Sequence, residues 1–119
     1  MADGLRGWTR LVRATTVSYW GLGWALRNEE AFRIEVVLCM LLAPLAFLLG
    51  SNKLEWALML MSLFIVLIVE LLNTGIEVVV DRISTERHPL SGAAKDVGSA
   101  AVHLSLLQVP VVWGLIIFG

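Results

Sequence analysis

Three carboxylates and one amide are spaced along a single apolar run so that they share one face of a predicted helix. They stand at intervals of three, four and four residues: Glu70, Asn73, Glu77 and Asp81. At 3.6 residues per turn, the four side chains fall within an arc of roughly 80°. Carboxylates in or near hydrocarbon are costly and usually face a protein interior, a partner or a wet cavity. The stripe therefore indicates a functional site.

Two further polar clusters are expected to lie at the same level as the stripe. The segment NEEAFRIE contributes Glu29, Glu30, Arg33 and Glu35. The segment SGAAKDVGSAAVH contributes Lys95, Asp96, Ser99 and His103. Carboxylates with an amide form the hard-oxygen site that Mg²⁺ prefers, and phosphate oxygens complete its coordination. Lys95 adds a positive charge for phosphate. The combination predicts phosphoryl transfer onto or off a lipid.

These residues also have structural explanations. Glu70 could be a structural carboxylate paired with Arg33 or Lys95, but four polar groups in register favour a functional role. The sequence contains no GxxxxGK[ST] phosphate loop and no HRD or DFG motif. A kinase built on this sequence would therefore belong to neither soluble kinase superfamily.

The elements that must position these residues are predicted to be membrane helices. The chain has 119 residues, of which 58% are hydrophobic, and its mean hydropathy is +0.81. That composition is too apolar for an ordinary soluble domain of this size. Since a spanning helix needs about 20 apolar residues, we expect spans over 30–49, 54–84 and 92–118. The second span extends into the cytoplasm, and the polar residues 84–92, broken by proline and glycine, predict a loop.

Residues 5–27 predict a helix of a different kind. Apolar residues recur there at helical spacing, while Arg6, Arg10 and Arg13 occupy another face. This pattern is typical of an amphipathic helix that lies in the plane of the membrane interface. We therefore predict an all-α membrane protein with three transmembrane helices and an N-terminal surface helix, forming one domain over 1–119.

The distribution of basic residues predicts the topology. Arginines precede the first span and basic residues flank the loop over 84–92, whereas Lys53 is the single basic residue in the other loop. By the positive-inside rule, the N-terminus is cytoplasmic and the C-terminus faces outward. Trp56 then marks the outer interface, and Glu70 lies 14 residues further on, about 21 Å inward. The net charge of -1 argues against nucleic acid as a partner.

Three motifs resemble the bacterial integral-membrane diacylglycerol kinase family: NEEAFRIE, VELLNTGIEVVVDRIS and LSGAAKDVGSAAV. The similarity covers nearly the whole chain. It implies a homotrimeric helical bundle in the bacterial cytoplasmic (inner) membrane, with composite active sites shared between subunits. It also implies that MgATP is the phosphoryl donor, diacylglycerol the acceptor and phosphatidate the product, so ATP and Mg²⁺ are the expected cofactors.

The resemblance also implies roles for residues at matching positions. Glu70 resembles the general base that takes the proton from the lipid hydroxyl, and Glu29 and Glu77 resemble the metal ligands. The expected nucleotide contacts are Arg10, Glu29, Glu77, Glu86, Arg87, His88, Lys95 and Asp96. The expected lipid contacts are Arg10, Ser18, Arg33, Glu35, Glu70, Asn73, Ser99 and Trp113.

Four positions depart from the family's pattern or add to it. Val17 and Arg87 stand where the family has aromatic residues, and Ala93 stands where it has a basic one. The contacts around adenine are therefore expected to differ at these positions. Glu30 adds an acidic group beside Glu29 and receives no role.

Three other functions compete with this interpretation. An undecaprenol kinase of the same family is the nearest alternative, although NEEAFRIE is more similar to the diacylglycerol branch. A small proton-coupled transporter would use Glu70 to bind cationic cargo, but this function leaves Lys95 and Asp96 unexplained. A non-catalytic membrane protein would use the polar stripe for assembly.

Overall fold

The part of the chain that the structure describes folds into four helices. The computed structural model describes residues 2–84 and 86–119, and every regular element in that part of the chain is an α-helix. The helices are α1 (Ala2–Asn28), α2 (Glu30–Leu49), α3 (Lys53–Ile83) and α4 (Pro89–Phe118). Three of them, α2, α3 and α4, are long and apolar enough to cross a membrane. The prediction of an all-α architecture with three candidate spans is confirmed.

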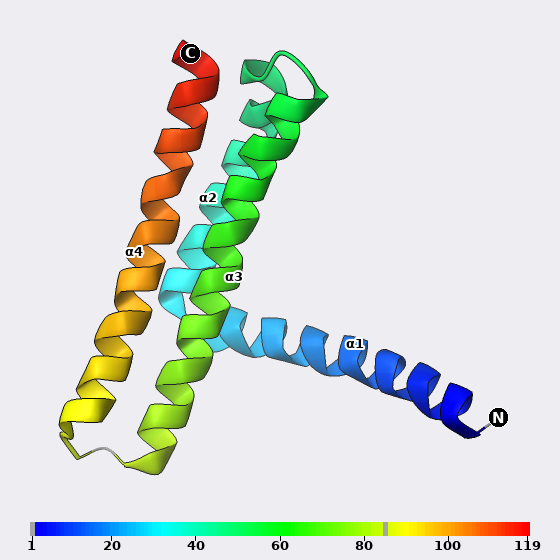
Figure 1. Cartoon of the computed structure of the whole chain (residues 1–119), viewed down its shortest axis with the longest axis vertical. Coiled ribbons are helices and arrows are strands. Elements are labelled where there is room, and N and C mark those ends of the chain that lie inside the picture. The colour runs from blue at the N-terminus through cyan, green and yellow to red at the C-terminus, as the bar shows by residue number, and fades with distance from the viewer. Residues whose placement is uncertain (1, 85) are drawn as a thin grey trace.

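Helix α3 is the centre of the bundle. It packs most extensively against α4 and also against α2, and Figure 1 shows α4 beside α3 with α2 behind it. Helix α1 leaves the bundle at a steep angle from the start of α2 (Figure 1). Residues of α3 can therefore meet side chains from each of the other three helices.

The core near the end of α4 combines apolar packing with polar contacts. Met59 and Trp113 are buried together with Ala46 and Leu63. The Trp113 Nε1–H donates to Ser62 Oγ over 2.9 Å, and Gln108 Nε2 donates to the Ser62 carbonyl oxygen over 2.8 Å. Hydrogen bonds between helices in an apolar setting have few competing partners, so these contacts fix how α4 is aligned along α3.

Local interactions set the ends of the helices. Asn52 Oδ1 accepts a hydrogen bond from the Glu55 amide over 3.0 Å and caps α3. Helix α4 begins at Pro89, where His88 Nδ1 accepts from the Leu90 amide over 3.1 Å. Proline suits the first helical turn because its φ is preset and its missing N–H is not needed there. The loop is consequently shorter than the predicted 84–92.

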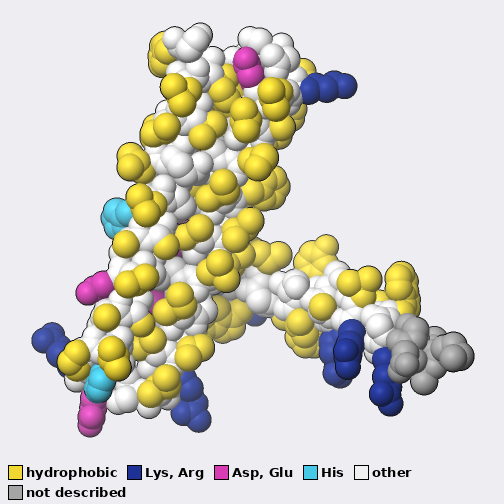
Figure 2. All heavy atoms as spheres, in the orientation of Figure 1, with side chains coloured by type: hydrophobic (Ala, Val, Ile, Leu, Met, Phe, Trp, Pro, Cys, Tyr) yellow, Lys and Arg dark blue, Asp and Glu magenta, His cyan; other side chains and the backbone are white. Residues whose placement is uncertain are grey.

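The surface of the bundle is mostly apolar. In Figure 2, hydrophobic side chains cover the visible length of the spans, while basic side chains gather at the lower end and along the lower side of α1. Leu48 and Phe118 are 77% and 88% exposed. A continuous apolar surface of this extent requires lipid or further protein to cover it.

Candidate active site

A pair of buried carboxyl groups lies between α2 and α3. Glu70 is 5% exposed and Glu35 is 9% exposed, and the two side chains lie within hydrogen-bonding reach of each other. Within the described part of the chain, the Oε2 atom of each has no hydrogen-bond partner. Within one chain neither Arg33 nor Lys95 pairs with Glu70, because Arg33 donates to carbonyl oxygens of α1 and Lys95 pairs with Asp81. An unpartnered buried carboxylate oxygen is available to accept a proton.

The stripe on α3 continues from Glu70 toward α4. Asn73 is buried, and its Nδ2 donates to Glu77 Oε1 over 3.3 Å. Its Oδ1 has no partner among the described residues and points at Gly98 of α4, where a Cβ atom would collide with it. Gly98 therefore leaves the space that the Asn73 amide occupies. Sequence reasoning missed this residue, and its only signal was a glycine three positions after Lys95.

The two expected metal ligands are half-buried glutamates near Glu70. Glu29 precedes α2 and Glu77 lies two turns beyond Glu70, and both are close enough to interact with its charge. In the described residues, no group of three His, Cys, Asp or Glu side chains is gathered around a common point. Mg²⁺ commonly takes one or two carboxylates and completes its shell with water and phosphate oxygens. Glu29 and Glu77 would supply two such carboxylates, and Glu77 Oε1 also accepts a hydrogen bond from Asn73 Nδ2.

A second polar region surrounds the loop between α3 and α4. A cavity of about 540 Å³ there is lined by residues that include Asp81, Glu86, Arg87, His88 and Lys95. Lys95 Nζ contacts Asp81 Oδ1 at 2.6 Å. Four of the expected nucleotide contacts therefore share one cavity, in which Asp81 is a partner that sequence reasoning did not assign to Lys95.

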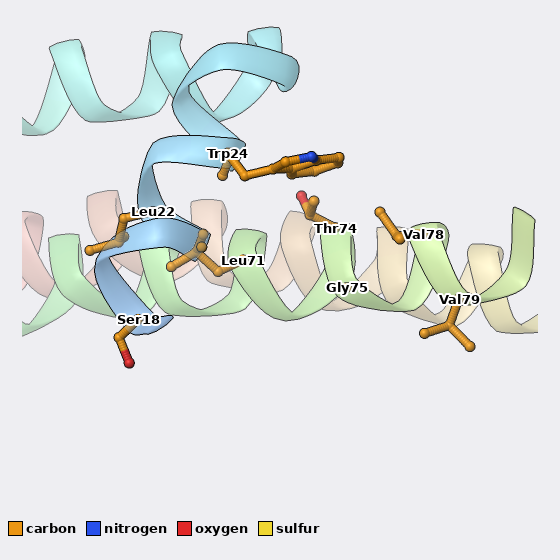
Figure 3. A pocket seen from close by; sticks show the side chains of 10 residues that line it. Ser18, Leu22, Trp24, Leu71, Thr74, Gly75, Val78 and Val79 are labelled. Atoms are coloured by element: carbon orange, nitrogen blue, oxygen red, sulfur yellow. The ribbon is translucent and has the colours of Figure 1, made fainter. Parts of the chain in front are cut away.

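An apolar groove of about 700 Å³ separates the C-terminal half of α1 from α3. Figure 3 shows the indole of Trp24 on α1 beside Thr74 on α3, with Val78 further along α3. Ser18 lines the groove, but its hydroxyl donates to the Ala14 carbonyl oxygen over 2.7 Å. The groove reaches Leu71 and Thr74, which are neighbours of Glu70 on α3. The groove therefore runs alongside the segment of α3 that carries Glu70.

Arg33 joins α1 to α2. Its Nη1 donates to the carbonyl oxygens of Leu26 and Arg27, each over 3.0 Å. These carbonyls belong to the last turn of α1, which has no further helical N–H groups to satisfy them. Arg33 thereby caps the C-terminus of α1 from the first turn of α2 and holds the angle between the two helices.

We expect Arg33→Gln to loosen α1, because glutamine is shorter and cannot donate to both carbonyls from the same position. Nitroxide labels at positions 14 and 41, in a Cys39→Ser background, would report this as a broader distribution of distances in electron paramagnetic resonance. The matched control is Arg27→Gln, since the Arg27 side chain makes no hydrogen bond to α2 within the described residues. An unchanged distribution in Arg33→Gln would show that the cap does not hold α1.

A single chain does not bring all the expected contacts together. Arg10 is exposed on α1, about 27 Å along the helix from its end at Asn28. Asp96 and Ser99 are exposed on α4. Trp113 is buried against Ser62, which lies eight residues, or about 12 Å, before Glu70 on α3. These four residues lie apart from the buried carboxyl pair.

Comparison with known proteins identifies a matching family model and several similar sequences. The family model described as prokaryotic diacylglycerol kinase matches residues 16–117. The diacylglycerol kinase of Haemophilus influenzae is 52% identical over 112 residues, which are 94% of this chain and 95% of the relative. That of Pseudomonas aeruginosa is 48% identical, over 98% of this chain and 94% of the relative. That of Escherichia coli is 42% identical, over 100% of this chain and 98% of the relative.

Proposed function

We propose that this chain, which belongs to the prokaryotic diacylglycerol kinase family, transfers the γ-phosphoryl group of MgATP to the hydroxyl of diacylglycerol. The product is phosphatidic acid. The chain is a lipid kinase of a bacterial membrane, as its relatives and its three apolar helices establish. The proposal adds the acceptor, the product and the residues that perform the transfer. The observation that carries it is the buried Glu70 carboxylate with one unpartnered oxygen.

Glu70 acts as the general base in this proposal. The lipid hydroxyl oxygen attacks the γ-phosphorus while Glu70 takes the hydroxyl proton, and the bond from the γ-phosphorus to the bridging oxygen breaks to release ADP. A carboxylate held out of water is suited to this role, provided that it lies within hydrogen-bonding reach of the hydroxyl. Glu35 helps to shape the site because it faces Glu70 from α2.

Binding of the nucleotide uses residues from α2, α3 and α4. Glu29 and Glu77 would hold Mg²⁺, with Asn73 supporting the site, and Mg²⁺ supplies positive charge that stabilises the transferring phosphoryl group. Lys95 contributes a further positive charge to the phosphates. The cavity around the α3–α4 loop offers Glu86, Arg87 and His88 to the rest of the nucleotide.

The lipid substrate is assigned to the groove between α1 and α3. Its lining is apolar and it leads to residues beside Glu70, as required for an acyl chain attached to a reacting hydroxyl. Ser18 lies on the α1 side of this groove, and Arg33 at the base of α1 holds the groove's wall. Bringing a lipid hydroxyl to an enclosed carboxylate positions the reacting atoms without exposing them to bulk water.

The remaining contacts support a homotrimer with shared sites. Asp96 and Ser99 present polar groups on an outer face of α4, and Arg10 lies far out on α1. These side chains can join a site when a neighbouring copy brings its own Glu70 to them. The proposed topology places the N-terminus in the cytoplasm and the C-terminus outside the inner membrane, in keeping with the basic residues at one end of the bundle (Figure 2).

Competition between two lipids tests the proposed acceptor. Diacylglycerol and undecaprenol are mixed at equal mole fraction in detergent micelles with MgATP, and both phosphorylated products are quantified. We expect phosphatidate to dominate, because a groove beside Glu70 and Ser18 suits a glycerol backbone that carries acyl chains. Undecaprenyl phosphate as the main product would assign the chain to polyprenol instead.

A further inference from the structure

The ion pair between α3 and α4 points to a role for a residue that the proposed function leaves unassigned. We propose that Asp81 is an exchangeable counter-ion, which holds Lys95 in the nucleotide cavity until a triphosphate takes its place. Asp81 is thus a positioning residue that acts through Lys95. This inference rests on the proposed function only in taking Lys95 as a nucleotide contact.

The geometry of the pair suits an exchange. Asp81 lies near the end of α3 and Lys95 in the second turn of α4, and both line the same cavity of about 540 Å³. Lys95 Nζ contacts Asp81 Oδ1 at 2.6 Å, and the two side chains are 44% and 57% exposed. At this distance the ion pair is formed, but both side chains remain accessible to water and solutes. Exposed ion pairs are weak, so a ligand with more negative charge can displace the carboxylate.

Several other charged and polar groups lie near Lys95, so a dedicated partner determines where its side chain lies. Glu77 lies one helical turn before Asp81 and interacts with the Lys95 charge. From the loop, Glu86, Arg87 and His88 face the same cavity. With Asp81 as its partner, Lys95 stays in the lining of the cavity, and Glu77 remains available to Asn73 and to a metal.

The exchange has a predictable cost for nucleotide binding. When Lys95 turns to a phosphate, it gives up its contact with Asp81, and the Asp81 carboxylate then stands near the incoming negative charge. Both effects oppose binding of ATP. Both also favour release of ADP, because its departure returns Lys95 to Asp81 and removes the repulsion between Asp81 and the phosphates. Asp81→Asn removes the charge with little change of shape, so it should tighten the binding of nucleotide.

The test measures steady-state kinetics of phosphatidate formation with varied MgATP. For Asp81→Asn, we expect the KM for ATP to fall by about two- to fivefold, which matches the strength of an exposed ion pair. The kcat should change less than this, and added salt should reduce the difference because it screens exposed charges. Asp81→Glu keeps the negative charge and should leave the KM close to that of the unsubstituted protein. Glu55→Gln, at the opposite end of α3, removes the same charge and should leave the KM unchanged.

A binding measurement separates this inference from the proposed function. Equilibrium binding of a non-hydrolysable ATP analogue should tighten in Asp81→Asn, but not when the same change is made in a Lys95→Gln background. An unchanged or weakened affinity in Asp81→Asn, or an equal gain in both backgrounds, would overturn the inference. If the unsubstituted protein phosphorylates no lipid while binding still tightens as expected, the proposed function fails and the exchange at Lys95 stands.

Discussion

Glu70→Gln should remove nearly all phosphatidate formation while leaving the helices and the assembly of the protein intact. Glutamine has nearly the same shape as glutamate but cannot take the proton from the lipid hydroxyl. General-base catalysis commonly contributes 10²–10⁴-fold, so we expect kcat to fall by about that factor. Because the substitution removes a buried charge that has no cationic partner, the thermal midpoint in detergent should stay the same or rise.

The measurement combines transfer of labelled phosphate with size-exclusion chromatography of both proteins. Glu30→Gln serves as the matched control, because Glu30 is exposed in the first turn of α2 and has no assigned role. Loss of activity in Glu70→Gln together with loss of assembly would support a structural role. Activity close to that of the unsubstituted protein would remove Glu70 from the role of base.

Gly98→Ala should lower kcat by roughly 10- to 100-fold, the usual cost of disturbing residues that support a metal site. The added methyl group would occupy the space of the Asn73 Oδ1 atom. Asn73 must then rotate, which breaks its hydrogen bond to Glu77 Oε1 and withdraws its amide from the stripe. The atom that must move is the Oδ1 at the end of the Asn73 side chain, not a backbone atom. We therefore expect the protein to fold and to lose chiefly activity.

Gly114→Ala is the matched control on the same helix, because a Cβ at Gly114 meets no atom within 4 Å. Alanine in a helix interior is favoured over glycine by about 0.5–1 kcal/mol, so this variant should be as active as the unsubstituted protein and slightly more stable. The double variant Gly98→Ala with Asn73→Ala removes the clash but should not recover activity. Full activity in Gly98→Ala would show that the Asn73 amide does not serve the reaction in this position.

The helical architecture was predictable because hydrophobic length and periodicity are local properties of a sequence. The run from Trp56 onward identifies α3, and the spacing of Glu70, Asn73 and Glu77 predicts that their side chains share a face. The structure shows in addition that Glu70 and Asn73 on this face are buried, between the neighbouring helices α2 and α4. Burial of a polar residue depends on packing between helices, which periodicity does not specify.

The contacts that sequence reasoning did not predict join residues from different helices. The Arg33 cap on α1, the Lys95–Asp81 pair and the Trp113–Ser62 hydrogen bond depend on helix angles and on how the helices align. Arg33 and Trp113 were expected to contact lipid, and in one chain the first caps a helix while the second packs in the core. Spacing in the sequence identifies polar residues of interest but does not say which partner each one has.

The most direct test of the proposed lipid kinase activity is phosphate transfer from ATP labelled in its γ-phosphate to dioleoylglycerol, with the purified protein in detergent micelles. The lipid products are separated with and without Mg²⁺, and circular dichroism of the same preparation reports whether the helices are folded. Labelled phosphatidate is expected to form only when Mg²⁺ is present. A folded protein that labels neither dioleoylglycerol nor undecaprenol would contradict the assignment of Glu70 to a lipid kinase site, and proton-coupled transport would then be the function to examine.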